Sequence, residues 1–189
     1  MTTRDGINLA LKIIGLTGLE ETIVVAPNDL QAINVLLRKK SNKTQNLPED
    51  RILRELKRQC LVEISSLQDG QFSFALTLIG AKRLQQVIID ELTIPTPKKW
   101  DSKWRIVSFD IPVKSSKQRL YFTRHLRAMG FMMLQRSLWI HPFSCFDVIE
   151  QLAGYYNVMR YCSFFEVSKV DNLSARRLLR RFEPLLSHR

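Results

Sequence analysis

The sequence predicts an α+β protein of two domains, a winged helix-turn-helix followed by a ferredoxin-like βαββαβ domain with a basic C-terminal helix. Three observations predict it: a proline-containing break in mid-chain, three helix patterns and a hairpin before the break, and alternating strand and helix patterns after it. The 189 residues are 45% hydrophobic. That content supports packed cores, and about 100 to 200 residues per domain leaves room for two small domains.

The break lies where Pro95 and Pro97 alternate with other residues. Such prolines exclude helix and favour an extended connector, so we expect domains at residues 1–94 and 104–189 joined by a linker at 95–103. Charge divides at the same place: residues 1–97 contain 12 Lys and Arg against 11 Asp and Glu, whereas residues 98–189 contain 17 against 7.

The formal charge of the whole chain is +11, and nearly all of the excess lies in the second half. Such an excess suggests a polyanionic partner, because cations that neutralise phosphates release condensed counterions. Nucleic acid is the leading candidate, ahead of membrane lipid, and the alternative is a basic surface with no partner.

No apolar run approaches the roughly 18 residues that cross a bilayer, and the first residues do not form a signal peptide. We therefore expect a cytoplasmic protein that does not bind membranes. Cys60, Cys145 and Cys162 lie far apart without metal-binding spacing. Three buried thiols are expected rather than a disulfide framework or a zinc site.

The first domain is predicted to begin with three helices. Ile7 to Leu16 is apolar at helical spacing, Asn28 to Lys40 follows with a capping Asn, and Pro48 opens the third helix in its preferred first turn. This third helix has two unlike sides. The packing side is expected to hold Leu53, Leu56 and Cys60, and the cationic side Arg51, Arg54, Lys57 and Arg58.

A hairpin and a closing helix complete the first domain. Leu61 to Ile64 and Phe72 to Thr77 read as strands that meet at an Asp69-Gly70 turn. Thr77 is expected to cap the closing helix. Its apolar positions are predicted at Ile79, Leu84, Val87, Ile88 and Leu92.

Three helices followed by a hairpin are the order of a winged helix-turn-helix, whose helix before the hairpin enters the major groove. The segments 56–63 (LKRQCLVE) and 76–84 (LTLIGAKRL) resemble winged-helix transcription regulators. We therefore expect the cationic side of the third helix to lie in or beside the major groove of DNA, and Gln68 and Gln71 of the wing to contact the backbone. A winged helix that binds only another protein is the alternative.

The second domain begins with a strand, Trp104 to Phe109, that ends at Asp110. A helix capped by Ser115 or Ser116 and stopped by Gly130 is expected next. Its inward positions are predicted at Leu120, Phe122, Leu126 and Met129, and its outward ones at Lys117, Arg119, Arg124 and Arg127.

An extended tract, Phe131 to Ile140, is interrupted by a bend at residues 135–137, and then come a helix, Phe146 to Tyr155, and a strand, Cys162 to Val167. The resulting βαββαβ order is the ferredoxin-like plan. A last helix, Leu173 to Leu186, follows and bears Arg176, Arg177, Arg180 and Arg181.

Two segments of the second domain carry a family resemblance: WRIVSFDIP at 104–112 and GFMMLQRSLW at 130–139. They resemble the small CRISPR-associated endonuclease subunit of the spacer-acquisition complex. With the winged helix ahead of them and the KKWDSKWR joint at 98–105, the whole arrangement is similar to the phenylacetate catabolon repressor family, the PaaX-like proteins. This resemblance implies a DNA-binding transcriptional regulator.

The CRISPR resemblance also implies that Asp110 is catalytic, with two copies across a homodimer axis holding a divalent metal. Mg²⁺ prefers carboxylate oxygens and retains waters that can attack phosphate. The alternative is an aspartate whose carboxylate accepts backbone hydrogen bonds and fixes the turn before Ile111-Pro112. His125, His141 and His188 are expected at the surface or in packing, and the three tryptophans are expected to anchor the junction and the sheet.

We therefore expect a homodimer, joined through the ferredoxin-like half, that presents two winged helices to a pseudo-palindromic duplex. DNA binding is expected to require no cofactor. The rival hypotheses are a CRISPR spacer-acquisition subunit that works with an integrase or cuts DNA with Mg²⁺, and a protein-protein adaptor. Sequence-independent phosphate attraction is assigned to Arg119, Arg124, Arg127, Arg176, Arg177, Arg180 and Arg181.

Overall fold

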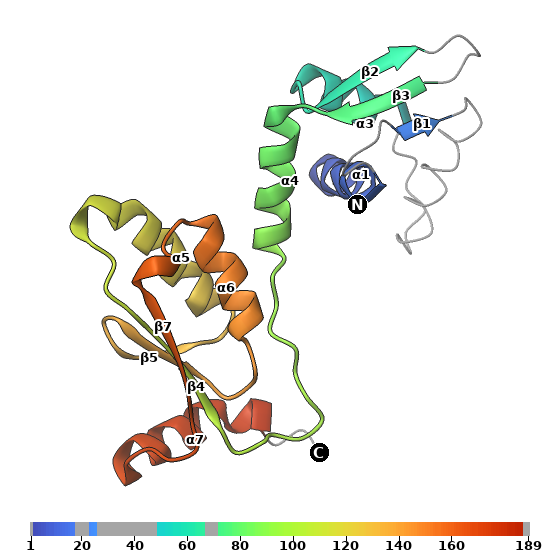
Figure 1. Cartoon of the computed structure of the whole chain (residues 1–189). Helices are drawn as coiled ribbons and strands as arrows, with labels where there is room; N and C mark the ends of the chain where they lie inside the picture. The colour runs from blue at the N-terminus through green and yellow to red at the C-terminus, as the bar shows by residue number, and fades with distance from the viewer. Residues whose placement is uncertain (1, 18–22, 26–48, 67–71, 187–189) are drawn as a thin grey trace. The chain divides into compact units, whose positions relative to one another are not determined.

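The computed structural model describes residues 2–17, 23–25, 49–66 and 72–186 (Figure 1). The chain divides into two compact units, residues 1–88 and 89–189. Each unit contains helices and an antiparallel sheet, so the α+β class is confirmed. The predicted helix at 28–40, the Asp69-Gly70 turn and His188 lie outside the described residues.

The first unit contains α1 (Thr3–Thr17), β1 (Ile23–Val25), α3 (Glu49–Arg58), β2 (Val62–Ser66) and β3 (Phe72–Leu76), and α4 (Leu78–Asp90) begins in it. Its antiparallel sheet has the order β1-β3-β2. The strand β1 is an addition to the sequence prediction, and it pairs with β3 in the register Ile23 to Phe74.

The core of the first unit lies where α1 and α3 pack with β2. Leu11 and Leu56 are fully buried, and Ile52 is buried one helical turn before Leu56. The expected packing position at Cys60 is wrong, because α3 ends at Arg58 and Cys60 is exposed with a left-handed φ of 53°. Its side chain therefore leaves the apolar stripe that the helical spacing predicts.

The start of α4 is fixed to the end of α3. As predicted, Thr77 caps α4, since its Oγ1 accepts a hydrogen bond of 3.0 Å from the Gly80 N–H. The same hydroxyl donates to the carbonyl of Cys60 at 2.5 Å. A Cβ on Gly80 would stand 1.9 Å from the carbonyl oxygen of Leu61, so only glycine permits this approach.

The apolar positions predicted for α4 are partly wrong. Val87 is buried, but Ile79 and Ile88 are 56% and 46% exposed. Ile89, which was not predicted, is buried in the core of the second unit, where Leu92 and Ile94 pack against it. The end of α4 therefore belongs to the second unit. The side of the helix that is buried there differs from the side that is buried in the first unit.

The second unit contains β4 (Trp104–Phe109), η1 (Val113–Ser115), α5 (Ser116–Ala128), β5 (Met132–Gln135), β6 (Leu138–His141), α6 (Phe146–Tyr155), η2 (Met159–Tyr161), β7 (Cys162–Val167) and α7 (Asn172–Leu186). Its four-stranded antiparallel sheet has the order β5-β6-β4-β7. This is the strand order of the predicted βαββαβ plan. The bend predicted at 135–137 is confirmed as the turn at residues 136–137 that joins β5 to β6, and a register shift lies just before it, between Met133 and Gln135.

The two faces of this sheet carry different helices (Figure 1). Val107 and Trp139 pack with Phe122 of α5 and Leu152 of α6, whereas α7 covers Trp104 and Ile140 on the other face. The inward position predicted at Leu120 is wrong, because this side chain is 55% exposed on α5. Ser115 precedes α5 but makes no side-chain capping hydrogen bond.

The segment before β4 is folded onto the second unit. Trp100 donates from Nε1 to the carbonyl of Pro142 at 2.9 Å, and its ring meets Trp104 with centroids 4.8 Å apart. Arg105, 5% exposed, forms ion pairs with Asp101 at 2.5 Å and Glu166 at 3.0 Å. The guanidinium thus ties this segment to both β4 and β7.

The expectation of three buried thiols is partly wrong. Cys145 is buried and Cys162 is half-buried, but Cys60 is exposed. Burial raises the pKa of Cys145 to about 12, so its sulfur stays protonated as a small apolar group. In the part of the chain that the structure describes, no helix is long and apolar enough to cross a membrane.

Candidate nucleic-acid interface

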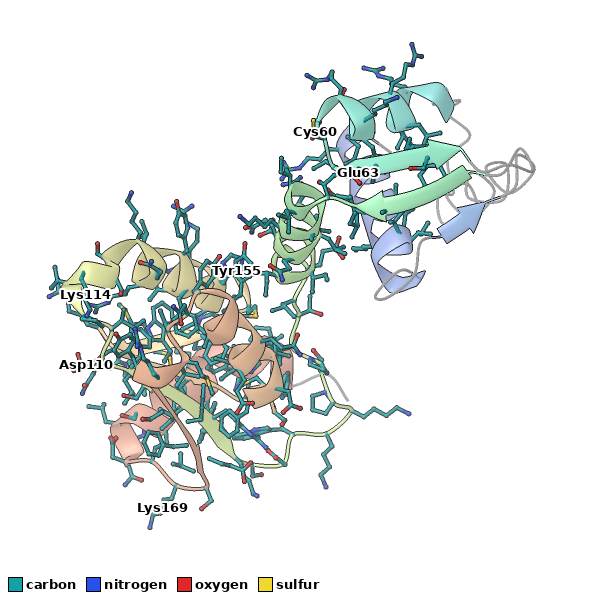
Figure 2. The ribbon with its side chains drawn as sticks, turned by 45° about the horizontal axis from the view of Figure 1, so that its top comes forward. Cys60, Glu63, Asp110, Lys114, Tyr155 and Lys169 are labelled. Carbon is teal, nitrogen blue, oxygen red and sulfur yellow. The ribbon has the colours of Figure 1, made fainter. Side chains whose placement is uncertain are left out.

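The cationic side predicted for α3 is present and exposed. Helical spacing places its four basic side chains within an arc of about 120°. The buried residues Ile52 and Leu56 lie outside that arc. Figure 2 shows nitrogen-tipped side chains that extend from α3 away from the strands. The exposed members are Arg51, Arg54, Lys57 and Arg58.

Arg58, on this side of α3, has an acidic partner. Arg58 donates from Nε to Glu55 Oε2 at 2.8 Å, and Gln59 donates to Glu55 Oε1 at 2.5 Å. The hydrogen bond from Arg58 lowers the pKa of Glu55 to about 2, so the carboxylate is ionised at neutral pH. Part of the Arg58 charge is therefore neutralised, and Glu55 orients the guanidinium. Gln68 and Gln71, assigned to the wing, lie outside the described residues.

The arginines of α5 lie over aromatic rings of the second unit. Arg119 is half-buried with its guanidinium carbon 5.9 Å from the Phe109 ring centre, and Arg127 lies 5.6 Å from that of the buried Trp139. Arg124 lies 5.9 Å from the ring of Tyr121. These side chains cover the edge of the core as well as carrying charge.

The arginines of α7 lie on its solvent side. Leu178 and Phe182 anchor the helix and are fully buried, whereas all four predicted arginines of this helix are exposed. Arg181 lies 5.6 Å from the ring centre of Phe182. Next to them Leu179, Arg180, Glu183 and Leu186 line an open hollow.

Asp110 lies directly after β4 and is exposed. Its main-chain N–H donates to the carbonyl of Tyr161 at 2.9 Å. Within the described residues its carboxylate accepts no hydrogen bond, so the turn is held by the main chain and the turn-fixing alternative is wrong. Figure 2 shows Asp110 at the same outer edge of this unit as Lys114. No group of three His, Cys, Asp or Glu side chains arranged for a metal ion occurs in the described segments.

The described histidines pack, as expected. His141 is 2% exposed and its ring meets Phe131, Phe143 and Phe182. His125 joins three elements: its Nδ1 lies 3.2 Å from the hydroxyl of Tyr156, and its Nε2 lies 3.5 Å from Asp90 at the end of α4.

The Asp90, His125 and Tyr156 cluster and the Arg105 network were not predicted. Asp90, His125 and Tyr156 lie tens of residues apart, as do Arg105 and Glu166, so no local spacing connects them. The one local signal was the opposite charge of Asp101 and Arg105, four residues apart.

The second unit is defined by its fold as an α+β domain in which two helices cover one sheet face and a basic helix covers the other. Residues 97–179 match the family model described as the PaaX protein central Cas2-like domain. This match confirms the predicted resemblance to the PaaX-like proteins for residues 97–179. No curated protein gives a significant match.

Proposed function

We propose that the chain is a homodimeric transcription regulator that binds duplex DNA. The observation that carries the proposal is the exposed cationic side of α3, which directly precedes the β2 and β3 pair. Regulators of the winged-helix class place this helix in the major groove. The match of residues 97–179 to the central Cas2-like domain of PaaX proteins supports the same function.

The first unit is proposed to be a winged helix-turn-helix. Its described order of helix, strand, helix and two antiparallel strands supports this, as does the pairing of β1 with β3. In this proposal Arg51, Arg54, Lys57 and Arg58 lie in or beside the major groove, and Gln68 and Gln71 contact the backbone.

The second unit is proposed to join two copies. Phe165 in β7 is 50% exposed, and it pairs with Ile106 of β4, whose side chain belongs to the α7 face of the sheet. Paired residues of an antiparallel sheet point to the same side, so Phe165 extends this apolar face beyond the part that α7 covers. A second copy seated there would give the dimer two copies of α3, as two-fold regulators need for half-sites about 34 Å apart or a multiple of it.

The dimer is tested by solution mass. The full chain is expected at twice 22.1 kDa. Phe165→Glu is expected to give the monomer, because it places a charge on the apolar face. Gln151→Glu, at an exposed position of α6 on the other face, is the matched control and keeps the dimer. A wild-type chain that is monomeric at micromolar concentration would contradict the proposed dimer and its binding to two DNA half-sites.

The regulator proposal is tested by selecting duplexes from a random pool with the full chain and then footprinting the selected sequence at about 0.15 M salt. A protected pseudo-palindrome is expected. Arg51→Gln with Lys57→Gln is expected to reduce the preference for that sequence, because base contacts carry discrimination. Arg4→Gln with Lys82→Gln makes an equal charge change at exposed positions of α1 and α4 and preserves the preference.

If the wild-type chain selects no sequence, or if the α3 variant keeps full selectivity, the regulator proposal is wrong. If the chain binds no duplex DNA even at low salt, the protein-protein adaptor is favoured. Circular dichroism of each variant separates loss of contact from loss of fold.

The exposed carboxylate of Asp110 favours a second candidate function, a CRISPR-adaptation subunit with an integrase partner or a Mg²⁺-dependent endonuclease. Among the described residues of one chain, Asp110 belongs to no group of three side chains that could hold a metal ion. In this candidate function its metal site therefore needs the same residue from a second copy. Mg²⁺-dependent nicking that Asp110→Asn abolishes supports the nuclease. DNA that stays intact with Mg²⁺ and wild-type protein excludes it.

A further inference from the structure

The basic side of α7 differs in geometry from the basic side of α5. Helical spacing places Arg176, Arg180, Arg177 and Arg181 in one arc of about 140° on α7. Within it, Arg176 and Arg180 form one row and Arg177 and Arg181 a second, each with a separation of about 6 Å along the axis. Two parallel rows of guanidinium groups are a surface that matches a chain of phosphates.

The α7 arginines have few competing partners. Within the described residues Arg176, Arg177 and Arg180 form no ion pair and lie over no ring. Glu183 is the single acid between residues 172 and 186. The arginines of α5, in contrast, lie over Phe109, Tyr121 and Trp139. The guanidinium groups of α7 therefore have their donors available for a ligand.

The helix itself is held in a fixed orientation. Leu178 and Phe182 are fully buried against Trp104 and Ile140. Asp171 accepts a hydrogen bond of 2.9 Å from the Ser174 N–H at the start of α7. Anchoring at the buried side and at the first turn presents the arc without a large cost in backbone order when a ligand binds.

We propose that α7 is a second nucleic-acid surface, which binds the phosphate backbone of duplex DNA irrespective of base sequence through Arg176, Arg177 and Arg180. The proposal deepens the proposed function and rests on its choice of duplex DNA as ligand. It assigns the sequence-independent affinity of the second unit to α7 rather than to α5. The two helices lie on opposite faces of the sheet, so a straight duplex on one does not contact the other.

A membrane surface is the other polyanion that an arginine-rich helix binds. A helix that lies in a bilayer interface needs an apolar side for the lipid. The apolar side of α7 is occupied, because Leu178 and Phe182 are buried in the protein core. DNA is therefore the favoured ligand, and lipid is an outcome of the test.

The experiment measures the affinity of the full chain for two labelled duplexes, the selected one and a scrambled one, between about 0.05 and 0.2 M salt. Each phosphate contact contributes about 0.9 to the slope of log K against log salt. Arg176→Gln with Arg180→Gln is expected to reduce that slope by about 2 and to weaken both duplexes about thirtyfold at 0.15 M salt. Arg177→Gln is expected to reduce the slope by about 1.

Lys98→Gln with Lys99→Gln is the matched control, since it removes two exposed charges from the segment before β4. It is expected to leave the slope unchanged. The proposal is overturned if the control weakens binding as much as the α7 variant does, if the α7 variants keep the wild-type slope, or if their loss is confined to the selected duplex. It is also overturned if they lose only binding to phosphatidylserine vesicles.

These outcomes are separate from failure of the proposed regulator. A chain without sequence preference whose slope still falls in the α7 variants contradicts the regulator and keeps the α7 surface. A chain whose sequence preference depends on Arg51 and Lys57, but whose salt slope is unchanged in the α7 variants, keeps the regulator and contradicts the α7 surface.

Discussion

The buried His141 makes the stability of the second unit dependent on pH. Its ring is 2% exposed, and its Nδ1 accepts a hydrogen bond of 3.2 Å from the N–H of Phe143. Burial lowers the pKa of His141 to about 4, and the nearby Arg105 charge acts in the same direction. Protonation at Nδ1 would place a charge in the core and remove that acceptor.

The sign and size of the effect follow from linkage. The unfolded chain binds a proton at His141 near pH 6.5, whereas the folded chain binds it only near pH 4. Stability is therefore complete above pH 6.5 and falls as the pH drops toward 4. At about 1.4 kcal/mol for each tenfold change in the proton-binding constant, the loss between pH 7 and pH 4.5 is about 2 to 3 kcal/mol.

Urea unfolding of the full chain at a series of pH values from 7 to 4.5, followed by tryptophan fluorescence, measures this loss. His141→Asn, whose Oδ1 retains an acceptor near the Phe143 N–H, is the comparison. It is expected to be less stable at pH 7, because ring contacts are lost, but to depend less on pH. The reasoning is refuted if wild type and variant lose the same free energy over this range.

Substitutions at four further positions test the structure. Thr77→Ala is expected to cost about 1 kcal/mol of unfolding free energy through loss of the helix cap, and Thr77→Ser to restore most of it. Gly80→Ala is expected to lower the free energy of unfolding by about 1 to 3 kcal/mol, because its Cβ meets a main-chain oxygen. Gly154→Ala, with open space around its Cβ, is expected to raise it by stabilising α6. Unfolding curves that shift in the same direction for both variants would contradict this. Arg105→Met is expected to raise the pKa of Asp101 from about 2 toward 3.8, because the hydrogen bonds from the guanidinium are removed. A carboxyl titration by NMR that leaves this pKa unchanged would show that Arg105 does not cause it.

The elements of the second unit were predictable to the residue in several cases. β4, α6 and β7 have the bounds that the sequence indicates. Their apolar residues are closely spaced and clear turn residues separate them, so the local sequence pattern determines where each element begins and ends. The three-residue strand β1 was missed, because so short a run shows no periodicity and gains its structure from pairing with β3.

The errors in side-chain placement have a common cause. The predicted inward sets were wider than the side of each helix that packs. Leu120 lies about 160° around α5 from the buried Phe122, and Ile79 about 80° around α4 from the buried Val87, so both are exposed. Conversely, the burial of Arg105 depends on Asp101 and on Glu166 of another strand, so no pattern around residue 105 indicates it.

The junction of α3 and α4 gives the first unit a mechanical continuity. The hydroxyl of Thr77, the cap of α4, accepts a hydrogen bond from the Gly80 N–H and donates one to the carbonyl of Cys60, and Gly80 leaves no gap against Leu61. A pivot of α4 about its first turn therefore carries the C-terminal end of α3 with it. In the proposed regulator, any ligand or partner that reorients α4 would thus change the pitch at which Lys57 and Arg58 meet DNA, and it would also strain the core of the unit, against which Leu84 of α4 packs.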